Sequence, residues 1–283
     1  MANLTQRLLY ACRQTYQIVA NDVPVPDAPN SGDIGWIGAP IGFIGGPLNI
    51  DAGLVGEIPE ANVIAFRGTL PPINPDFQTL LDWLNDLDAL LVPDPQGLPG
   101  KVHQGFRDAR DAIWAPIVQA LAAKPAKPVL IVGHSKGGAV ANLAAARLHR
   151  ERPASQISVC TFAAARPGDP QFASSYNAAI GHSDRYEFQD DIVPFLPPSD
   201  AFYDLIKLIP AVDQLIGHFN SGFESVGRLY FIDWSNHIVP DSALLEFQRF
   251  THLAELIVEL DFATIANDHS IDPGSGYADA PYT

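Results

Sequence analysis

The sequence Val129-Leu130-Ile131-Val132-Gly133-His134-Ser135-Lys136-Gly137 decides the interpretation of the fold. Its four apolar residues, bounded by Pro128 and Gly133, predict a buried strand. The Ala-rich stretch 139–150 ends in cations that suit a helix C-terminus, so it predicts a helix. Ser135 therefore lies in a sharp turn from strand to helix, which needs small residues two positions before and after it. Gly133 and Gly137 meet that need, and the whole pattern is typical of a nucleophile elbow.

The segments around this turn predict an alternation of strands and helices. Short apolar runs at 63–66, 157–162, 185–188 and 228–232 predict further strands. Between the first of these and the strand at 129, residues 106–123 place apolar side chains on one helical face, as in a crossover helix. Glycines between 32 and 56 punctuate short runs and favour hairpins, and residues 1–18 favour an amphipathic helix. We expect one domain over 1–283 with a mostly parallel α/β sheet flanked by helices.

A serine hydroxyl is a poor nucleophile without a base, and the base needs a carboxylate to fix its tautomer. In folds with this elbow the chain order is serine, acid, histidine, so both partners are expected after Ser135. His269 in the last loop is favoured as the base, with His237 as the competitor after the strand at 228–232. Either Asp190 or Asp191 suits the acid, because both directly follow the strand at 185–188.

Composition excludes several function classes. Lys plus Arg is 17 against 32 Asp plus Glu, a formal net charge of −15, which repels phosphate backbones and anionic headgroups. Nucleic acid is therefore not an expected partner. No apolar run approaches a membrane span, and no metal-binding motif is present, so neither a membrane span nor a metal or other cofactor is expected. Two cysteines give no disulfide framework. No signal peptide is visible, so we expect secretion only if a leader was removed, and a cytoplasmic location otherwise.

Four separated segments together resemble the class 3 lipase family of α/β-hydrolases, the fungal-type triacylglycerol lipases with their feruloyl esterase and phospholipase A1 relatives. The similarity spans residues 63–270 and keeps the family's order along the chain. Supporting pieces lie at 82–87, 161–169 and 268–270. The four segments are Val63-Ile64-Ala65-Phe66-Arg67-Gly68-Thr69, Lys101-Val102-His103-Gln104-Gly105-Phe106, Gly133-His134-Ser135-Lys136-Gly137-Gly138 and Asp191-Ile192-Val193-Pro194-Phe195-Leu196-Pro197-Pro198.

The resemblance implies a role for each matching residue. Ser135 is the implied nucleophile, Asp191 the acid and His269 the base. Thr69, through its backbone N–H and its hydroxyl, and the backbone N–H of Lys136 are the implied oxyanion hole. The other polar residues of these motifs are implied to brace the loops around the site: Arg67, Asp86, His103 and Arg166.

Two apolar segments depart from the family pattern. Residues 70–81 predict an apolar lid, and residues 200–222 form an apolar stripe that reads either as core or as a second cap element. The implied activity is serine ester hydrolysis through an acyl-enzyme, with a triacylglycerol lipase acting on lipid esters at an oil–water interface as the first expectation. A general carboxylesterase or a feruloyl esterase is the alternative. A phospholipase A1 and a non-catalytic binding scaffold are less favoured.

Overall fold

The strand predicted before Ser135 forms β7 (Val129–His134), in the middle of a nine-stranded sheet. The structure is a computed structural model, and it describes residues 2–30, 32–69 and 90–282. In the order of the sheet, the strands are β1 (Val23–Pro24), β2 (Ile41–Gly45), β3 (Asp51–Glu57), β4 (Asn62–Phe66), β7, β8 (Ile157–Phe162), β9 (Ser183–Phe188), β10 (Arg228–Ile232) and β11 (Ile238–Val239).

The centre of this sheet is parallel, as predicted. β4, β7, β8, β9 and β10 run in one direction, while antiparallel strands extend both edges. In the register of β4 and β7, Phe66 pairs with Gly133, and on the other side His134 pairs with Phe162. The residues that follow these strands therefore emerge together at the carboxyl edge of the sheet, where this class of fold places its ligands.

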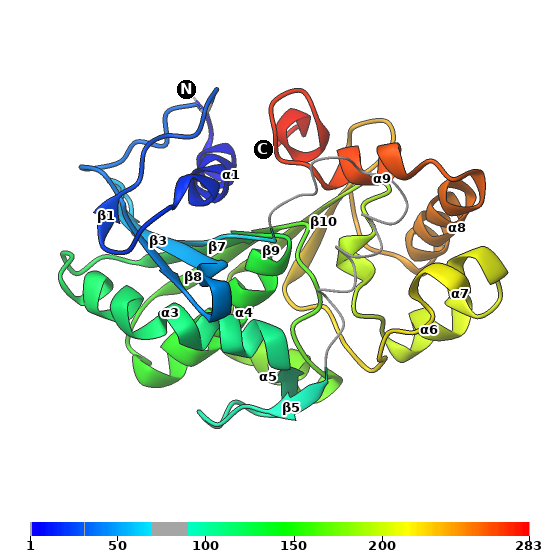
Figure 1. Cartoon of the computed structure of the whole chain (residues 1–283), viewed down its shortest axis with the longest axis horizontal. Helices are drawn as coiled ribbons and strands as arrows, with labels where there is room; N and C mark the ends of the chain where they lie inside the picture. Colours follow the sequence, from blue (N-terminus) through cyan, green and yellow to red (C-terminus); the bar gives the residue numbers. More distant parts are fainter. Residues whose placement is uncertain (1, 31, 70–89, 283) are drawn as a thin grey trace.

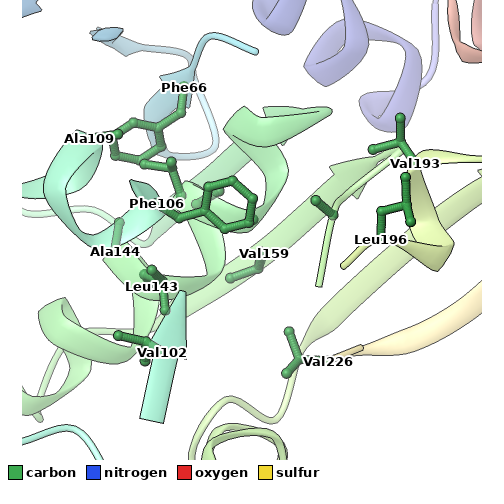
Figure 2. Close-up of a cluster of buried hydrophobic side chains, with 14 of the residues drawn as sticks. Phe66, Val102, Phe106, Ala109, Leu143, Ala144, Val159, Val193, Leu196 and Val226 are labelled. Carbon is green, nitrogen blue, oxygen red and sulfur yellow. The ribbon is translucent and has the colours of Figure 1, made fainter. Parts of the chain in front are cut away.

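Helices cover both faces of the sheet (Figure 1). α1 (Leu4–Gln14), followed by the short helix η1 (Thr15–Gln17), packs on one face. On the other face lie α3 (Gln104–Ala122), α4 (Lys136–Glu151) and α5 (Pro170–Ala179). Strand β4 shows why both faces are covered. All of its residues are buried, and successive side chains point to opposite faces of the sheet. Ile64 and Phe66 join the cluster under α3 and α4, whereas Val63 and Ala65 join the cluster under α1. Figure 2 shows Phe66 in the first cluster with Phe106 and Leu143.

After β9 the chain is mostly helical, apart from β10 and β11. The segment predicted as core or cap forms the two short helices α6 (Asp200–Ile206) and α7 (Pro210–Ile216). Phe202, Ile206, Val212 and Phe219 are buried in the main apolar cluster, so much of this stripe is core, and its role as a cap stays a prediction. The remaining elements are η2 (Pro47–Asn49), β5 (Leu91–Pro93), β6 (Lys101–His103), η3 (Val193–Phe195), α8 (Ala243–Glu259), α9 (Phe262–His269) and η4 (Gly276–Asp279).

The predicted lid at 70–81 and the motif at 82–87, which includes Asp86, lie outside the described residues. Across the ranges that the structure describes, no helix is both long enough and apolar enough to cross a membrane.

Candidate active site

Ser135 lies in a strained turn at the carboxyl end of β7. Its backbone has φ 61° and ψ −133°, a conformation that costs a non-glycine residue about 1–3 kcal/mol and that persists mainly at functional sites. The turn also brings backbone very close to its flanking glycines. A Cβ on Gly133 would overlap the Gly137 carbonyl, and a Cβ on Gly137 would overlap the Phe66 carbonyl. The close packing of α4 against β7 therefore requires glycine at 133, and its close packing against β4 requires glycine at 137.

The Ser135 side chain is buried at the start of α4. Only 1% of the residue is exposed, and its hydroxyl has no hydrogen-bond partner among the described residues. The hydroxyl of Thr69 is also buried and has no hydrogen-bond partner among the described residues. The segment that carries Thr69 packs directly against the turn at Ser135, because a Cβ on Gly68 would come within 2.9 Å of the Ser135 Cβ. Two unpaired buried hydroxyls on adjacent segments are unusual in a folded protein and mark a place where a ligand can supply the missing partner.

The first turn of α4 adds hydrogen-bond donors beside these hydroxyls. Ser135 is the residue that caps the helix, so Lys136 contributes the first helical N–H, which has no partner within the helix. The helix dipole gives this end a partial positive charge that suits an anionic oxygen. The charged end of the Lys136 side chain lies elsewhere, because its Nζ pairs with Asp51 Oδ1 on β3 at 2.7 Å.

Asp191 and His269 lie together, although 78 residues separate them in sequence. His269 Nδ1 is 2.9 Å from Asp191 Oδ1, and Asp191 is 1% exposed. The backbone N–H of Val193 donates to the same oxygen at 3.0 Å. Tyr277 donates its hydroxyl to the other oxygen, Oδ2, at 2.8 Å. The carboxylate is therefore held on both sides and is oriented toward the imidazole.

The competing residues from the sequence have other contacts. Asp190 accepts a hydrogen bond from the indole N–H of Trp234 at 2.7 Å. The side chain of His237 is 77% exposed and lies 3.9 Å from Asp233 in its own loop. The structure therefore brings Asp191 and His269 together and places Asp190 and His237 in separate contacts.

The bracing residues implied by the resemblance hold the loops at this edge. Arg67 donates from its guanidinium to the carbonyl oxygens of Ile18 at 3.1 Å and Ile50 at 2.7 Å. His103 caps α3 by accepting from the Phe106 N–H at 3.2 Å. Arg166 lies over the Phe202 ring, and burial lowers the pKa of its guanidinium to about 10. Arg67 and Arg166 thus contact neighbouring segments, whereas His103 caps the helix that follows it.

Two contacts of the site carry no signal in the sequence. Tyr277 lies in a polar C-terminal segment without periodicity, yet it is fully buried and bonded to Asp191. His134, which the sequence indicates only as structural or pocket-lining, hydrogen-bonds the backbone carbonyl of His269 through Nε2 at 2.9 Å. Both contacts join segments more than 80 residues apart, which no local pattern reports.

The carboxylates of Asp190, Asp191 and Asp268 lie near one another, next to His269 in space or in sequence. Asp268 Oδ2 accepts from the backbone N–H of Asp190 at 3.1 Å. Burial, with the nearby charges of Asp190 and Asp191, raises the pKa of Asp268 to about 6. No set of three or more His, Cys, Asp or Glu side chains that could hold a metal ion is found in the described part of the chain.

The chain is similar in sequence to known lipases. The family model described as "Lipase (class 3)" matches residues 63–201. Over these residues the chain is similar to this family. A lipase of Rhizopus niveus is 31% identical over 163 residues, covering 55% of this chain and 41% of the relative. A secreted mono- and diacylglycerol lipase of Fusarium solani is 39% identical over 101 residues, covering 34% and 30%.

Solved lipase structures show the fold. The structure of Rhizomucor miehei triacylglyceride lipase superposes with a TM-score of 0.57 at 22% identity, over 81% of this chain and 78% of that chain. The predicted α/β-hydrolase fold is thereby confirmed. In sequence, the match to the first curated relatives covers about two fifths of their length.

Proposed function

We propose that the chain is a serine ester hydrolase, most specifically a triacylglycerol lipase, built as one α/β-hydrolase domain. The observation that carries this proposal is the unpaired, buried hydroxyl of Ser135 on its strained turn, at the sheet edge that also holds the Asp191–His269 pair. The His269 ring lies 4.7 Å, centre to centre, from the ring of His134, the residue next to Ser135. A strained serine near an oriented imidazole suits acyl transfer.

In the proposed first half-reaction, Ser135 Oγ attacks the ester carbonyl carbon while His269 Nε2 takes the hydroxyl proton. The carbonyl π electrons move to the oxygen, which the backbone N–H groups of Thr69 and Lys136 and the Thr69 hydroxyl receive. Asp191 keeps the proton on Nδ1 and stabilises the imidazolium. One oxyanion donor of this kind typically contributes about 3–4 kcal/mol to transition-state stabilisation.

The proposed intermediate then collapses, and the bond between the carbonyl carbon and the alcohol oxygen breaks. His269 gives its proton to the departing alcohol, which leaves the acyl group on Ser135. Water repeats the sequence, with His269 as its base, and releases the carboxylic acid. The proposed steps use side chains and backbone N–H groups of this chain, together with one water molecule.

A neutral lipid ester is the proposed substrate class. The relatives named above are lipases, and one is named for mono- and diacylglycerols. The sequence at 70–81 supplies Leu70, Ile73 and Phe77 for a predicted lid. The net charge of −15 disfavours anionic surfaces but leaves uncharged glyceride surfaces accessible. These features support an uncharged oil surface as the place of action.

The test is hydrolysis of a four-carbon and a sixteen-carbon nitrophenyl ester and of emulsified triolein, with Ser135→Ala as the control. We expect activity on triolein that rises when the substrate exceeds its solubility, and loss of at least about a thousandfold in the control. Activity on the short ester alone would replace the lipase assignment with a soluble carboxylesterase. Equal rates for both proteins would overturn the proposed nucleophile.

A further inference from the structure

A chain of hydrogen bonds runs from the N-terminal segment to the backbone of the candidate base. Tyr16, in η1 directly after α1, places its hydroxyl 2.9 Å from His134 Nδ1. His134 in turn places Nε2 2.9 Å from the carbonyl oxygen of His269. The rings of His134 and His269 also lie 4.7 Å apart, centre to centre. His134 is 5% exposed, so these contacts are shielded from water.

The partners of His134 fix where its proton lies. A carbonyl oxygen only accepts hydrogen bonds, so Nε2 must carry the hydrogen that points at His269. In the neutral ring Nδ1 is then the acceptor, and the Tyr16 hydroxyl must donate to it. Burial, with the neighbouring His269, lowers the pKa of His134 well below its ordinary value, which keeps the ring neutral.

The same tyrosine hydroxyl also contacts the loop that carries Thr69. The Gly68 backbone lies against the Tyr16 hydroxyl, because a Cβ on Gly68 would come within 2.5 Å of that oxygen. Gly68 therefore accepts no larger residue at this point. One hydroxyl thus touches the candidate oxyanion loop on one side and, through His134, the loop of the candidate base on the other.

We propose that Tyr16 and His134 are positioning residues for ester hydrolysis, holding the His269 backbone and the Gly68–Thr69 loop in register with Ser135. The inference rests on the proposed function, and it adds a residue from outside the matched range 63–201 to the working site. Tyr16 touches no reacting atom. Its effect passes through His134, which it keeps in the tautomer that donates to the base-bearing loop.

The variant that isolates this role is Tyr16→Phe, which removes one oxygen and keeps the ring. Tyr10→Phe is the matched control, because Tyr10 is a half-buried tyrosine of α1 that packs on Gly32 away from this chain of bonds. With a soluble nitrophenyl ester, we expect kcat to fall about ten- to a hundredfold in Tyr16→Phe with KM unchanged, since small displacements of a catalytic group cost rate in that range. Tyr10→Phe should stay within about twofold of the wild type.

A second pair of variants tests His134 itself. His134→Gln keeps an N–H donor at a similar distance from the backbone, whereas His134→Leu keeps only the bulk. We expect the Gln variant to retain at least about ten times the kcat of the Leu variant at equal thermal stability. Equal kcat in the two, or Tyr16→Phe indistinguishable from Tyr10→Phe, would overturn the proposal.

Nitrogen-15 NMR of the histidine rings provides a readout that does not depend on activity. The proposal expects His134 to stay neutral with its proton on Nε2 from pH 5 to 8 in the wild type, and its Nδ1 signal to shift in Tyr16→Phe. A cationic His134 at pH 6, or a proton on Nδ1, would overturn it. If the wild type hydrolyses no ester, the proposed function fails, and these ring signals alone decide whether the hydrogen-bond chain exists.

Discussion

Thr69 is the residue whose hydroxyl most directly tests the oxyanion hole. This hydroxyl is buried without a partner among the described residues, as is the hydroxyl of Ser135 on the adjacent segment. In Thr69→Val a methyl group replaces the hydroxyl at nearly the same shape, so we expect kcat to fall about a hundred- to a thousandfold with KM little changed. Thr69→Ser keeps the hydroxyl and should retain most of the rate. Steady-state kinetics on a soluble ester measures both variants, and equal rates would show that the hydroxyl takes no part.

At this scale the sequence predicts the type of each functional group better than its contacts. The turn at Ser135 and its two glycines can be predicted, because the strand, the turn and the helix follow one another directly in the chain. No local pattern distinguishes His237 from His269, since each lies in a segment that suits a catalytic base. Its place in the last loop favours His269, and the fold separates the two by placing His269 beside Asp191 and leaving His237 at the surface.

The strand-to-helix turn is the element on which the site depends most. A Cβ on Gly137 would overlap the Phe66 carbonyl on β4, so α4 could not keep its position against the sheet. We expect Gly137→Ala to lower the free energy of unfolding by about 1–3 kcal/mol and to reduce activity further. Gly181→Ala is the control, because a Cβ there meets nothing within 4 Å, and it should change stability by less than about 0.5 kcal/mol. Urea titration compares them, and similar losses in both would contradict this packing argument.

The elements that sequence predicts well are those buried on both faces. β4 and β8 match the apolar runs at 63–66 and 157–162 closely, because every residue of such a strand must be apolar or paired. For the segment at 200–222, the sequence does not distinguish a core helix from a cap element. An apolar stripe looks the same whether it packs on the core or covers a pocket, and here Phe202 and Ile206 enter the core while Leu208 stays exposed.

At the scale of the whole molecule, stability should depend on pH through Asp268. Its pKa is raised to about 6 by burial and by Asp190 and Asp191, above the value near 4 of an unfolded chain. The folded state therefore holds this proton more tightly, so the contribution to stability is complete below about pH 4 and is lost as the pH rises through about 6. Asp268→Asn is neutral at every pH, so it should match the wild type near pH 4 and unfold at a higher temperature at pH 8.

Thermal unfolding between pH 4 and 8 measures this difference. Asp204→Asn, on the exposed side of α6, is the matched control, because it removes one negative charge from a molecule with a net charge of −15 without touching the buried carboxylates. At pH 8 its unfolding temperature should differ less from that of the wild type than the unfolding temperature of Asp268→Asn does. A pH-independent difference for Asp268→Asn would contradict the assignment of a raised pKa to this group.

The three-dimensional arrangement joins parts of the chain that sequence analysis treats separately. Tyr16 from the N-terminal segment and Tyr277 from the C-terminal segment both reach the site, through His134 and Asp191 respectively. Neither tyrosine belongs to a motif, because their partners lie more than 80 residues away. The sequence therefore predicts the fold and indicates the candidate reacting groups, whereas the residues that hold those groups emerge only from tertiary packing.

The central claim, that Ser135 is a nucleophile activated by His269, is tested most directly by labelling the whole chain with a fluorophosphonate and mapping the adduct by mass spectrometry. We predict a single adduct on Ser135, formed at the wild-type rate in His237→Ala and at least about a thousandfold more slowly in His269→Ala. An unlabelled protein, an adduct on another residue, or slow labelling in His237→Ala instead of His269→Ala would contradict it.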